Sequence, residues 1–528
     1  MNNLSTFLFS KLTLGQEAAA APLVSWGDFQ AILPALIFIA TGTLLLMLDC
    51  FNRGLSRTGE SKREHSSLSA AINFIGLLGT VAAGAFVCAA MEQSQATVFA
   101  FGDSIRVDSY SSSVTLIIIL GTFFSLLSAM DYLRRFDAEH GEFHCLVHYA
   151  AASMILFVQS NNLIMLFLTV ETLSMAVYLL TSYLRDSRRG VEGGLKYIIL
   201  GSFSSGFLLF GFTLLFGATG EINLSAIAGS ISSGEADQSL LLAGMALGII
   251  GLGFKVGAFP FHSWLPDAYE AAPTVATGFM SVTVKSAAIF VLLRFLMLAS
   301  DQEGAAGAAT AAEIFTPVLS LLAIATMLFG NLVALMQDSV KRMLAYSAIG
   351  HTGYLLVGIV AALGPGGKAA AAAVIFYLLP YTLMSLAVFT LLGYMGRDGQ
   401  DRENFGDYRG LSTQRPFLSL CLRIVLVSFA GLPPTAGFWA KLYIFRAAVD
   451  GGHTWLGLTG ILTSILSLYF YLRLVVNVYM RPAEEEIDAD PDSNLASGLV
   501  IATAALALVI LGIFPDLNLE ALLDTLGR

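Results

Sequence analysis

Four ionisable residues stand inside long apolar stretches of this sequence, where charged side chains are rare. Glu171 lies in LTVETLSMAVYLL, Lys255 in GLGFKVG, Lys285 in SVTVKSAAIFVLLR and Lys441 in FWAKLYIF. A charge at the centre of a membrane helix costs about 2.5–3.5 kcal/mol on insertion scales unless it faces protein or water. Three central lysines with one acid therefore indicate a functional set.

The chemistry available to these four residues is the storage and transfer of protons. A low-dielectric interior disfavours the ammonium form of a lysine, and a nearby carboxylate restores it, so a moving carboxylate switches the lysine between two states. Such groups, bridged by water, pass protons without a redox centre or a nucleophile. For Glu171 and a single lysine, a buried ion pair that only fixes helix register is an equal alternative. The three lysines together favour ion transport.

Two histidines are further candidates for this relay. His351 follows Tyr346 and Ser347 at a depth that places it between Lys285 and Lys441, although a lone intramembrane histidine also serves as a hydrogen-bonding helix contact. His262 stands beside a proline, and its alternative role is to bond backbone groups that the proline frees.

The sequence contains no motif that indicates a metal or cofactor site. The four cysteines are far apart and form no CxxC pair, which argues against zinc and iron–sulfur clusters. His140, Glu142, His144 and His148 share helical spacing but have no matching ligand set elsewhere, so we expect no metal. GLGFKVG follows no strand and lacks phosphate-loop spacing. We therefore expect no cofactor on this chain.

Composition identifies the elements that must position these residues. Of 528 residues, 56% are hydrophobic and only 12% charged, and the mean hydropathy is +0.74. Charged residues make up about a quarter of a soluble domain, so this chain is a polytopic, all-α membrane protein. Its net charge of −10 argues against a nucleic-acid partner and leaves membrane lipid as its surroundings.

A membrane helix needs about 20 apolar residues to cross roughly 30 Å of hydrocarbon. The sequence predicts about fourteen such helices, over residues 29–49, 68–91, 110–130, 143–160, 162–184, 195–217, 239–260, 274–298, 314–337, 341–363, 369–395, 417–449, 455–480 and 495–514. Most lysines and arginines fall in the loops after odd-numbered helices, which predicts that both termini lie on the outer side of the membrane.

Of the basic residues within predicted helices, four lie toward helix ends, where we expect membrane anchors or local ion pairs: Arg294, Arg423, Arg446 and Arg473. The helices that carry Lys255 and Lys441 contain prolines beside them, Pro260 in one and Pro433 and Pro434 in the other. Proline opens the helix ladder. Unwound backbone within a membrane is tolerated where it lines a cavity or is buried in protein, so both helices are expected to be broken at mid-depth.

The broken helices are the seventh and the twelfth, five helices apart. This spacing predicts two five-helix repeats, helices 4–8 and 9–13, of which the second is inverted. The expected division is an extramembrane lead-in at 1–28, helices 1–3 at 29–142, the first repeat at 143–298, the second repeat at 314–480 and a last helix at 495–514.

Four segments carry a family resemblance across about residues 30 to 515: FKVGAFPFHSWLPDAYEAAPT, SVTVKSAAIFVLLR, GNLVALMQDSVKRMLAYSAIGHTGYLLVG and GLPPTAGFWAKLYIF. With these motifs the chain resembles the antiporter-like subunits of complex I and the related Mrp-type cation/proton antiporters, and within that group it is most similar to the subunit N family. Lys441, the stop at Arg528 and the YEAAP run carry that distinction. Val275 departs from the proline that relatives often have there.

The resemblance implies roles for the four charges: Glu171 and Lys255 form a modulating pair, Lys285 is a central relay and Lys441 is the terminal lysine on the exit side. It also implies a translocase, a proton-pumping subunit of NADH:quinone oxidoreductase in a bacterial inner membrane. No redox chemistry occurs on this chain, and flavin mononucleotide and iron–sulfur clusters belong to partner subunits. The expected neighbours are K- and M-type membrane-arm subunits. An Mrp-type Na⁺/H⁺ antiporter subunit without redox partners is the alternative, and a purely structural membrane scaffold is a third possibility.

Overall fold

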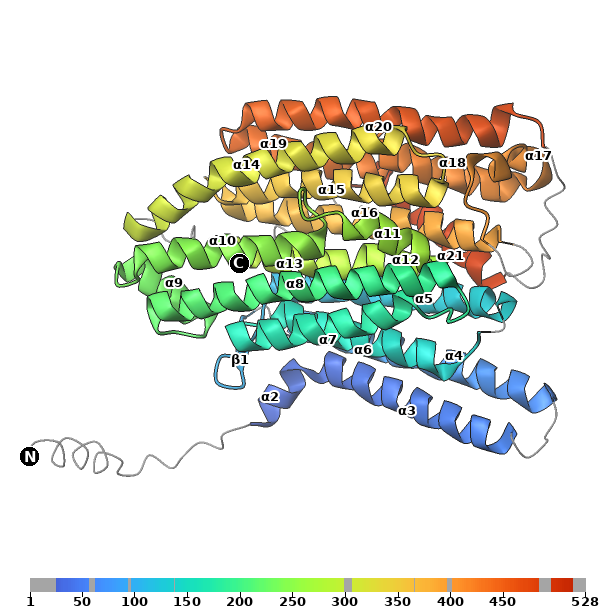
Figure 1. Ribbon diagram of the computed structural model, residues 1–528, viewed down its shortest axis with the longest axis horizontal. Coiled ribbons are helices and arrows are strands. Elements are labelled where there is room, and N and C mark those ends of the chain that lie inside the picture. Colours follow the sequence, from blue (N-terminus) through green and yellow to red (C-terminus); the bar gives the residue numbers. More distant parts are fainter. Residues whose placement is uncertain are drawn as a thin grey trace, which may run out of the picture.

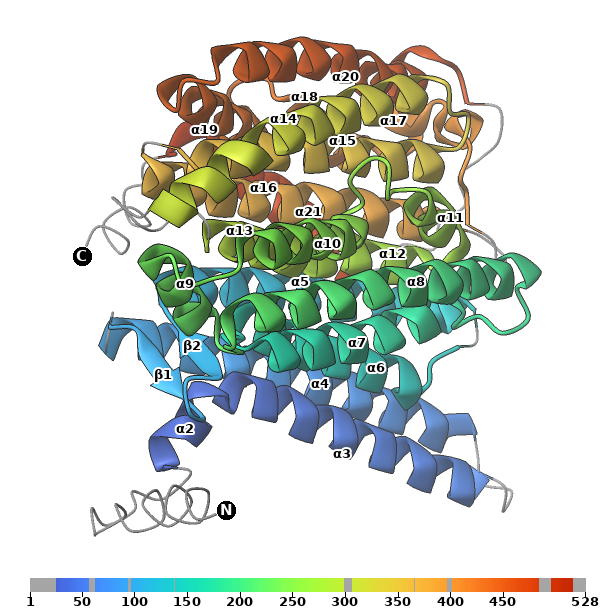
Figure 2. The same cartoon turned by 60° about the vertical axis from the view of Figure 1, so that its left-hand side comes forward.

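The computed structural model is a layered bundle of long, roughly aligned helices (Figure 1). It describes residues 25–56, 62–93, 96–136, 138–298, 306–364, 366–396, 401–483 and 495–515. The two views place α3 (Leu33–Ser56) at one edge of the bundle and α20 (Thr454–Met480) at the opposite edge (Figures 1 and 2). Most of the expected lead-in, residues 1–24, lies outside the described residues, and α2 (Trp26–Ala31) begins just after it.

Thirteen spans in the described part of the chain are long and apolar enough to cross a membrane. Twelve of them are formed by α3, α20 and the helices α4 (Lys62–Gln93), α5 (Ser109–Arg135), α6 (Gly141–Gln159), α7 (Leu163–Thr181), α8 (Arg188–Thr219), α10 (Gln238–Val256), α14 (Ala306–Leu335), α15 (Val340–Ala362), α16 (Gly367–Tyr394) and α21 (Leu495–Ile513). The remaining one, Thr274–Met297, combines α12 (Thr274–Phe279), the π-helix η1 (Met280–Val284) and α13 (Lys285–Met297). The predicted polytopic, all-α fold is confirmed.

The remaining predicted crossing, 417–449, is divided between α18 (Pro416–Ala430) and α19 (Ala436–Asp450). Each half is shorter than a membrane span, so the two together replace one long helix. The other predicted break follows α10, where Gly257 adopts the left-handed conformation and the short α11 (Trp264–Ala271) comes next. Both interruptions therefore lie at the proline motifs.

Short elements cap the ends of the bundle. A two-stranded antiparallel hairpin, β1 (Val98–Ala100) and β2 (Ile105–Val107), precedes α5, and α9 (Leu224–Ser233) connects α8 to α10. On the opposite end of the bundle, η2 (Phe405–Tyr408) and α17 (Leu411–Gln414) lead into α18.

Burial within the protein differs strongly between helices. In the most apolar windows of α15, α16 and the α12–α13 span, 94% of residues are buried, whereas the corresponding figure for α4 is 22%. Three central helices therefore have protein on nearly every side, and peripheral helices present apolar side chains outward. A charge on a central helix faces protein and not lipid, so it avoids the energetic cost of exposure to the lipid.

Glycines bring two of these helices unusually close. A Cβ on Gly330 of α14 would lie 2.4 Å from the backbone nitrogen of Gly350 in α15. Small residues permit such close approach between membrane helices, where packing drives association. The contact holds α15 firmly against α14, which is relevant because α15 carries His351.

Candidate proton-transfer site

Lys255 is buried at the end of the first interrupted helix. It lies in the last turn of α10, and Gly257 ends that helix with a φ of 73°. The Lys255 ammonium donates to the Ser174 hydroxyl of α7 at 2.7 Å, and the Tyr178 hydroxyl lies 3.5 Å away. The Trp264 indole of α11 donates to the Phe254 carbonyl at 2.9 Å, which satisfies one acceptor freed by the break. A cation is also favoured at the carbonyl end of a helix dipole.

Glu171 lies one turn before Ser174 on α7 and is only partly buried. Its carboxylate accepts a short hydrogen bond from the Ser205 hydroxyl of α8. Glu171 and Lys255 do not form a direct ion pair within 4 Å. Each of the two charged groups is therefore bound by a serine hydroxyl, Lys255 by Ser174 and Glu171 by Ser205.

Lys285 is the first residue after the π-helix η1 and is 2% exposed. Its ammonium donates to the Ala348 carbonyl of α15 at 2.7 Å and approaches the Tyr381 hydroxyl of α16 at 3.3 Å. π-Helical turns widen the backbone ladder and are frequent at functional sites. The contacts place Lys285, itself on one of the three most buried spans, against the other two, α15 and α16.

His351 lies on α15, one turn after Ser347, and is 2% exposed, as Lys285 is. Its Nδ1 is 2.5 Å from the Tyr377 hydroxyl and its Nε2 is 3.2 Å from the Tyr471 hydroxyl. The ring also packs against Tyr381 with centroids 5.2 Å apart. His351 is therefore linked through Tyr381 to Lys285.

Lys441 lies on α19 and is buried beside the second interruption, which separates α18 from α19. Its ammonium donates to the carbonyls of Phe429 at 2.9 Å and Ala430 at 3.3 Å, and to the Ser464 hydroxyl at 2.8 Å. The last carbonyls of a helix have no partner in their own helix, so the break in this span creates the acceptors that Lys441 uses. The Phe429 ring packs against His351 with centroids 5.4 Å apart, which joins Lys441 to the histidine.

Helix α15 connects the separate contacts. The Thr352 hydroxyl donates to the Val256 carbonyl, next to Lys255, at 2.8 Å, and contacts the Ala348 carbonyl at 3.1 Å. The same Ala348 carbonyl accepts from Lys285. Hydrogen bonds thus lead from α10 through Thr352 and the Ala348 carbonyl to Lys285. Ring packing on Tyr381 and Phe429 then places His351 between Lys285 and Lys441. Buried polar groups in such an order can hold and exchange protons through hydroxyls and added waters.

His262 is placed apart from this row. Its ring packs against Phe259 with centroids 5.4 Å apart and against Phe329 at 4.3 Å. No described hydrogen bond joins it to the four charged residues. The structure therefore brings Glu171, Lys255, Lys285, His351 and Lys441 into one row and leaves His262 beside it.

Three of the four basic residues near helix ends form ion pairs of the predicted kind, and the fourth contacts an aromatic ring. Arg294 pairs with Asp108 at 2.5 Å, Arg473 with Asp338 at 3.1 Å and Arg446 with Asp450 at 3.4 Å. Arg423 lies over the Tyr479 ring. Within the described residues no group of three or more His, Cys, Asp or Glu side chains is arranged to hold a metal ion.

Sequence reasoning missed the hydroxyls of this site. Ser174 and Ser205 are ordinary residues for a membrane helix, and Tyr377 and Tyr471 come from helices far along the chain. The spacing of Glu171 and Ser174 on one helix was the only sequence signal for any of them. Sequence reasoning also gave Lys341 no role at the first residue of a predicted helix, whereas this residue is buried in the first turn of α15. The hydropathy limit of that helix fell only one residue from its true start, so depth could not be inferred there.

Two interrupted helices, each with a buried lysine beside the break, are typical of an antiporter-like membrane subunit. The family model described as NADH:quinone oxidoreductase/Mrp antiporter, TM, matches residues 160–467. A chain of the Mrp complex from Dietzia sp. DQ12-45-1b has the same fold, with a TM-score of 0.75 at 23% identity over 95% of this chain and 97% of that one.

The more specific matches are to complex I. The chain is 39% identical to NADH-quinone oxidoreductase subunit N of Myxococcus xanthus over 94% of this chain and 96% of the relative. A chain of respiratory complex I from Thermus thermophilus with bound aureothin has a TM-score of 0.75 at 30% identity, over 93% of this chain and 99% of that one. The chain belongs to the NADH-quinone oxidoreductase subunit N family.

Proposed function

We propose that this chain is a proton-translocating membrane-arm subunit of NADH:quinone oxidoreductase. It is one subunit of a translocase whose redox cofactors, flavin mononucleotide and iron–sulfur clusters, reside on other subunits. Membership of the subunit N family and the fold shared with a complex I chain support this assignment. Other membrane-arm subunits, of the K and M types, are the proposed neighbours.

The observation that carries the mechanism is the row of buried cations along α15. Lys255, Lys285 and Lys441 are each 5% exposed or less. Each has hydroxyl or carbonyl acceptors, and among the described residues none has a carboxylate within ion-pair distance. A buried ammonium without a counter-charge is costly, so each lysine can release its proton when its surroundings change. We propose that Glu171 modulates Lys255, that Lys285 is the central relay and that Lys441 is the exit group.

His351 is the proposed relay between Lys285 and Lys441, because it contacts Tyr381 on one side and Phe429 on the other. His262 is proposed as an accessory relay group beside the break in the first repeat. Helices 4–8 and 9–13 are proposed as inverted repeats, so that each interrupted helix delivers one lysine to the row. Both termini are proposed to lie on the outer side of a bacterial inner membrane.

Lys255→Ala and Glu171→Ala test this function in the assembled complex. Each variant is expected to lower the number of protons pumped per NADH oxidised, while the helices still insert and the complex still contains the subunit. Arg446→Ala removes an exposed ion pair and serves as the control. Normal pumping by assembled Lys255→Ala and Glu171→Ala complexes would contradict the proposal.

An Mrp-type Na⁺/H⁺ antiporter subunit is the second candidate, because the shared fold of the Dietzia Mrp chain favours it. Purification separates the two functions. Co-isolation with flavin and iron–sulfur subunits supports the first function, whereas Na⁺/H⁺ exchange by an assembly without redox centres supports the second.

A further inference from the structure

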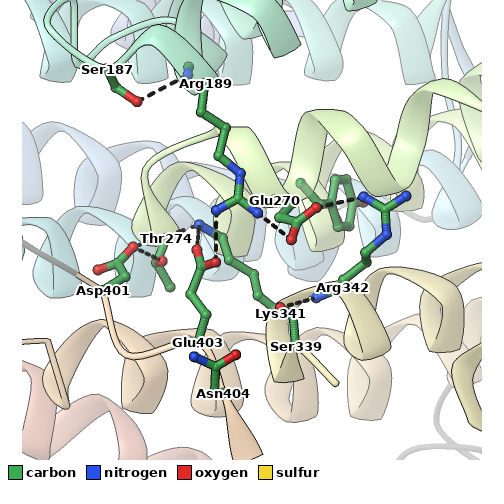
Figure 3. Close-up of polar contacts among 12 residues, drawn as sticks. Ser187, Arg189, Glu270, Thr274, Ser339, Lys341, Arg342, Asp401, Glu403 and Asn404 are labelled. Carbon is green, nitrogen blue, oxygen red and sulfur yellow. Dashed lines mark hydrogen bonds and ion pairs between the residues drawn. The ribbon is translucent and has the colours of Figure 1, made fainter. Parts of the chain in front are cut away.

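A cluster of charged side chains lies at the end of the bundle where α8, α11 and α15 meet the segment before η2 (Figure 3). It is called the ionic cluster here and consists of Arg189, Glu270, Lys341, Arg342, Asp401 and Glu403. Arg189 pairs with Glu403 at 3.0 Å and also with Glu270, and Arg342 pairs with Glu270 at 2.6 Å. None of these residues belongs to the row of lysines described above.

Lys341 is the most buried member of the ionic cluster, with 2% of its side chain exposed. Its ammonium donates to the Ala272 carbonyl at 2.7 Å and lies 3.7 Å from Asp401 and 3.6 Å from Glu403. A buried cation is retained when carboxylates and hydrogen-bond acceptors surround it. The carbonyl that Lys341 selects belongs to the joint between α11 and α12.

Asp401 holds the other side of the same joint. The Thr274 hydroxyl donates to the Asp401 carboxylate, and the Tyr132 hydroxyl donates to it at 3.0 Å. The Tyr132 hydroxyl in turn accepts from the Thr274 amide at 3.2 Å. Thr274 is the first residue of α12, and Pro273 before it provides no side-chain cap. Asp401 and Tyr132 therefore take the part that a capping residue plays at other helix starts.

The joint leads directly to Lys285. Thr274 begins the α12–η1–α13 span, and Lys285 lies eleven residues further along it. Lys285 donates to the Ala348 carbonyl, seven residues after Lys341 on α15 and about 10 Å along the helix at 1.5 Å per residue. The two helical spans are thus joined at two levels by lysine-to-carbonyl hydrogen bonds that run in opposite directions.

We propose that Lys341, together with Asp401, is a positioning residue that fixes the α12–α13 span against α15. It thereby keeps Lys285 beside the Ala348 carbonyl and the Tyr381 hydroxyl. The proposal rests on the proposed function, in which Lys285 is a proton-transfer group. Lys341 exchanges no proton with the row in this account, because the polar contacts of its side chain with described residues are to the joint and the ionic cluster. It acts by holding the backbone that carries Lys285.

The experiment compares Lys341→Met, which removes the ammonium, with Lys341→Arg, which keeps a cationic donor. Both are studied in the purified, assembled complex, with Arg446→Ala as the exposed ion-pair control. Hydrogen–deuterium exchange is measured for residues 274–285, and protons pumped per NADH are measured in proteoliposomes. Lys341→Met is expected to raise exchange at the start of α12 by tenfold or more and to lower the pumping ratio at least twofold. Lys341→Arg is expected to restore most of both.

Asp401→Asn provides a second route to the same result, since it keeps the shape of the side chain and removes its charge. If both residues form one anchor, the double variant Lys341→Met/Asp401→Asn is expected to match the more severe single variant; multiplied effects would contradict a shared role. Unchanged exchange and an unchanged pumping ratio in assembled Lys341→Met, or in Asp401→Asn where Lys341→Met does not assemble, would overturn the inference.

Lys285→Met separates this inference from the proposed function. Normal pumping by Lys285→Met would contradict the function of the row itself. Loss of pumping in Lys285→Met together with normal pumping and exchange in Lys341→Met would contradict only the positioning role of Lys341.

Discussion

Ser174→Ala removes the hydroxyl that most closely contacts the Lys255 ammonium. The Ser174 oxygen lies 2.7 Å from the ammonium, whereas Tyr178 lies 3.5 Å away, which is too far for a strong hydrogen bond. A hydrogen bond to a charged group contributes about 1.5–3 kcal/mol, and about 1.4 kcal/mol corresponds to a tenfold change in an equilibrium. The variant is therefore expected to disfavour the protonated form of Lys255 by about tenfold or more at a fixed pH.

The assay is NADH-driven proton pumping by the assembled complex in proteoliposomes, measured as a function of pH. Because the variant weakens proton binding, lost pumping should return when the pH is lowered by about 1 to 2 units. Ser174→Thr keeps the hydroxyl and is the matched control. Wild-type pumping by Ser174→Ala at every pH, or a loss that does not recover at lower pH in intact complex, would refute the reasoning.

Two further predictions concern stability, and each has a matched control in the chain. Gly330→Ala would place a Cβ 2.4 Å from the Gly350 backbone, so it is expected to cost about 1–3 kcal/mol and to lower the melting temperature of the complex. Gly206→Ala is the control, because a Cβ there has no neighbour within 4 Å and should leave the melting temperature unchanged. Equal melting temperatures for the two variants would contradict the packing argument. Asp108→Ala would remove the carboxylate partner of Arg294, whose side chain is only 12% exposed, and is expected to cost about 3–5 kcal/mol. Arg106→Ala, whose side chain is 36% exposed, is expected to cost about 1 kcal/mol or less. Subunit retention on heating measures this difference, and similar retention of the two variants would refute it.

The pKa of Asp108 predicts how the stability of the protein changes with pH. Burial opposes ionisation of its carboxylate, but the Arg294 guanidinium, the Ser111 amide and Arg106 together hold the pKa of Asp108 below its ordinary value. The stability from this pair is therefore fully present above the unfolded value near 3.8 and is lost as the pH falls through the lower folded-state pKa.

Much of the fold could be predicted from the sequence because the bilayer imposes a simple rule on helix length. The predicted limits 341–363 and 455–480 differ from those of α15 and α20 by at most one residue at either end. The two breaks could be predicted as well, since proline removes a backbone donor and clashes with the preceding turn. Helix pairing could not, because apolar membrane helices lack the periodic polar face that identifies a partner.

A related cause decides which residues of the site could be predicted from the sequence. Lys255, Lys285 and Lys441 could be recognised because a charge in an apolar stretch is conspicuous by its cost. Their acceptors could not, since Ala348 and Phe429 contribute backbone carbonyls, which any residue supplies. The Glu171 to Lys255 pairing was implied by the family resemblance, and the serine that contacts each of them was not.

The central claim is that protons move through the row of buried lysines in this chain. Its most direct test is the number of protons pumped per NADH by assembled complex carrying Lys285→Met, measured beside Lys285→Arg. The account predicts a clear fall in the ratio for Lys285→Met, because the middle of the row loses its proton carrier, and a smaller fall for Lys285→Arg. An unchanged ratio in Lys285→Met would contradict it.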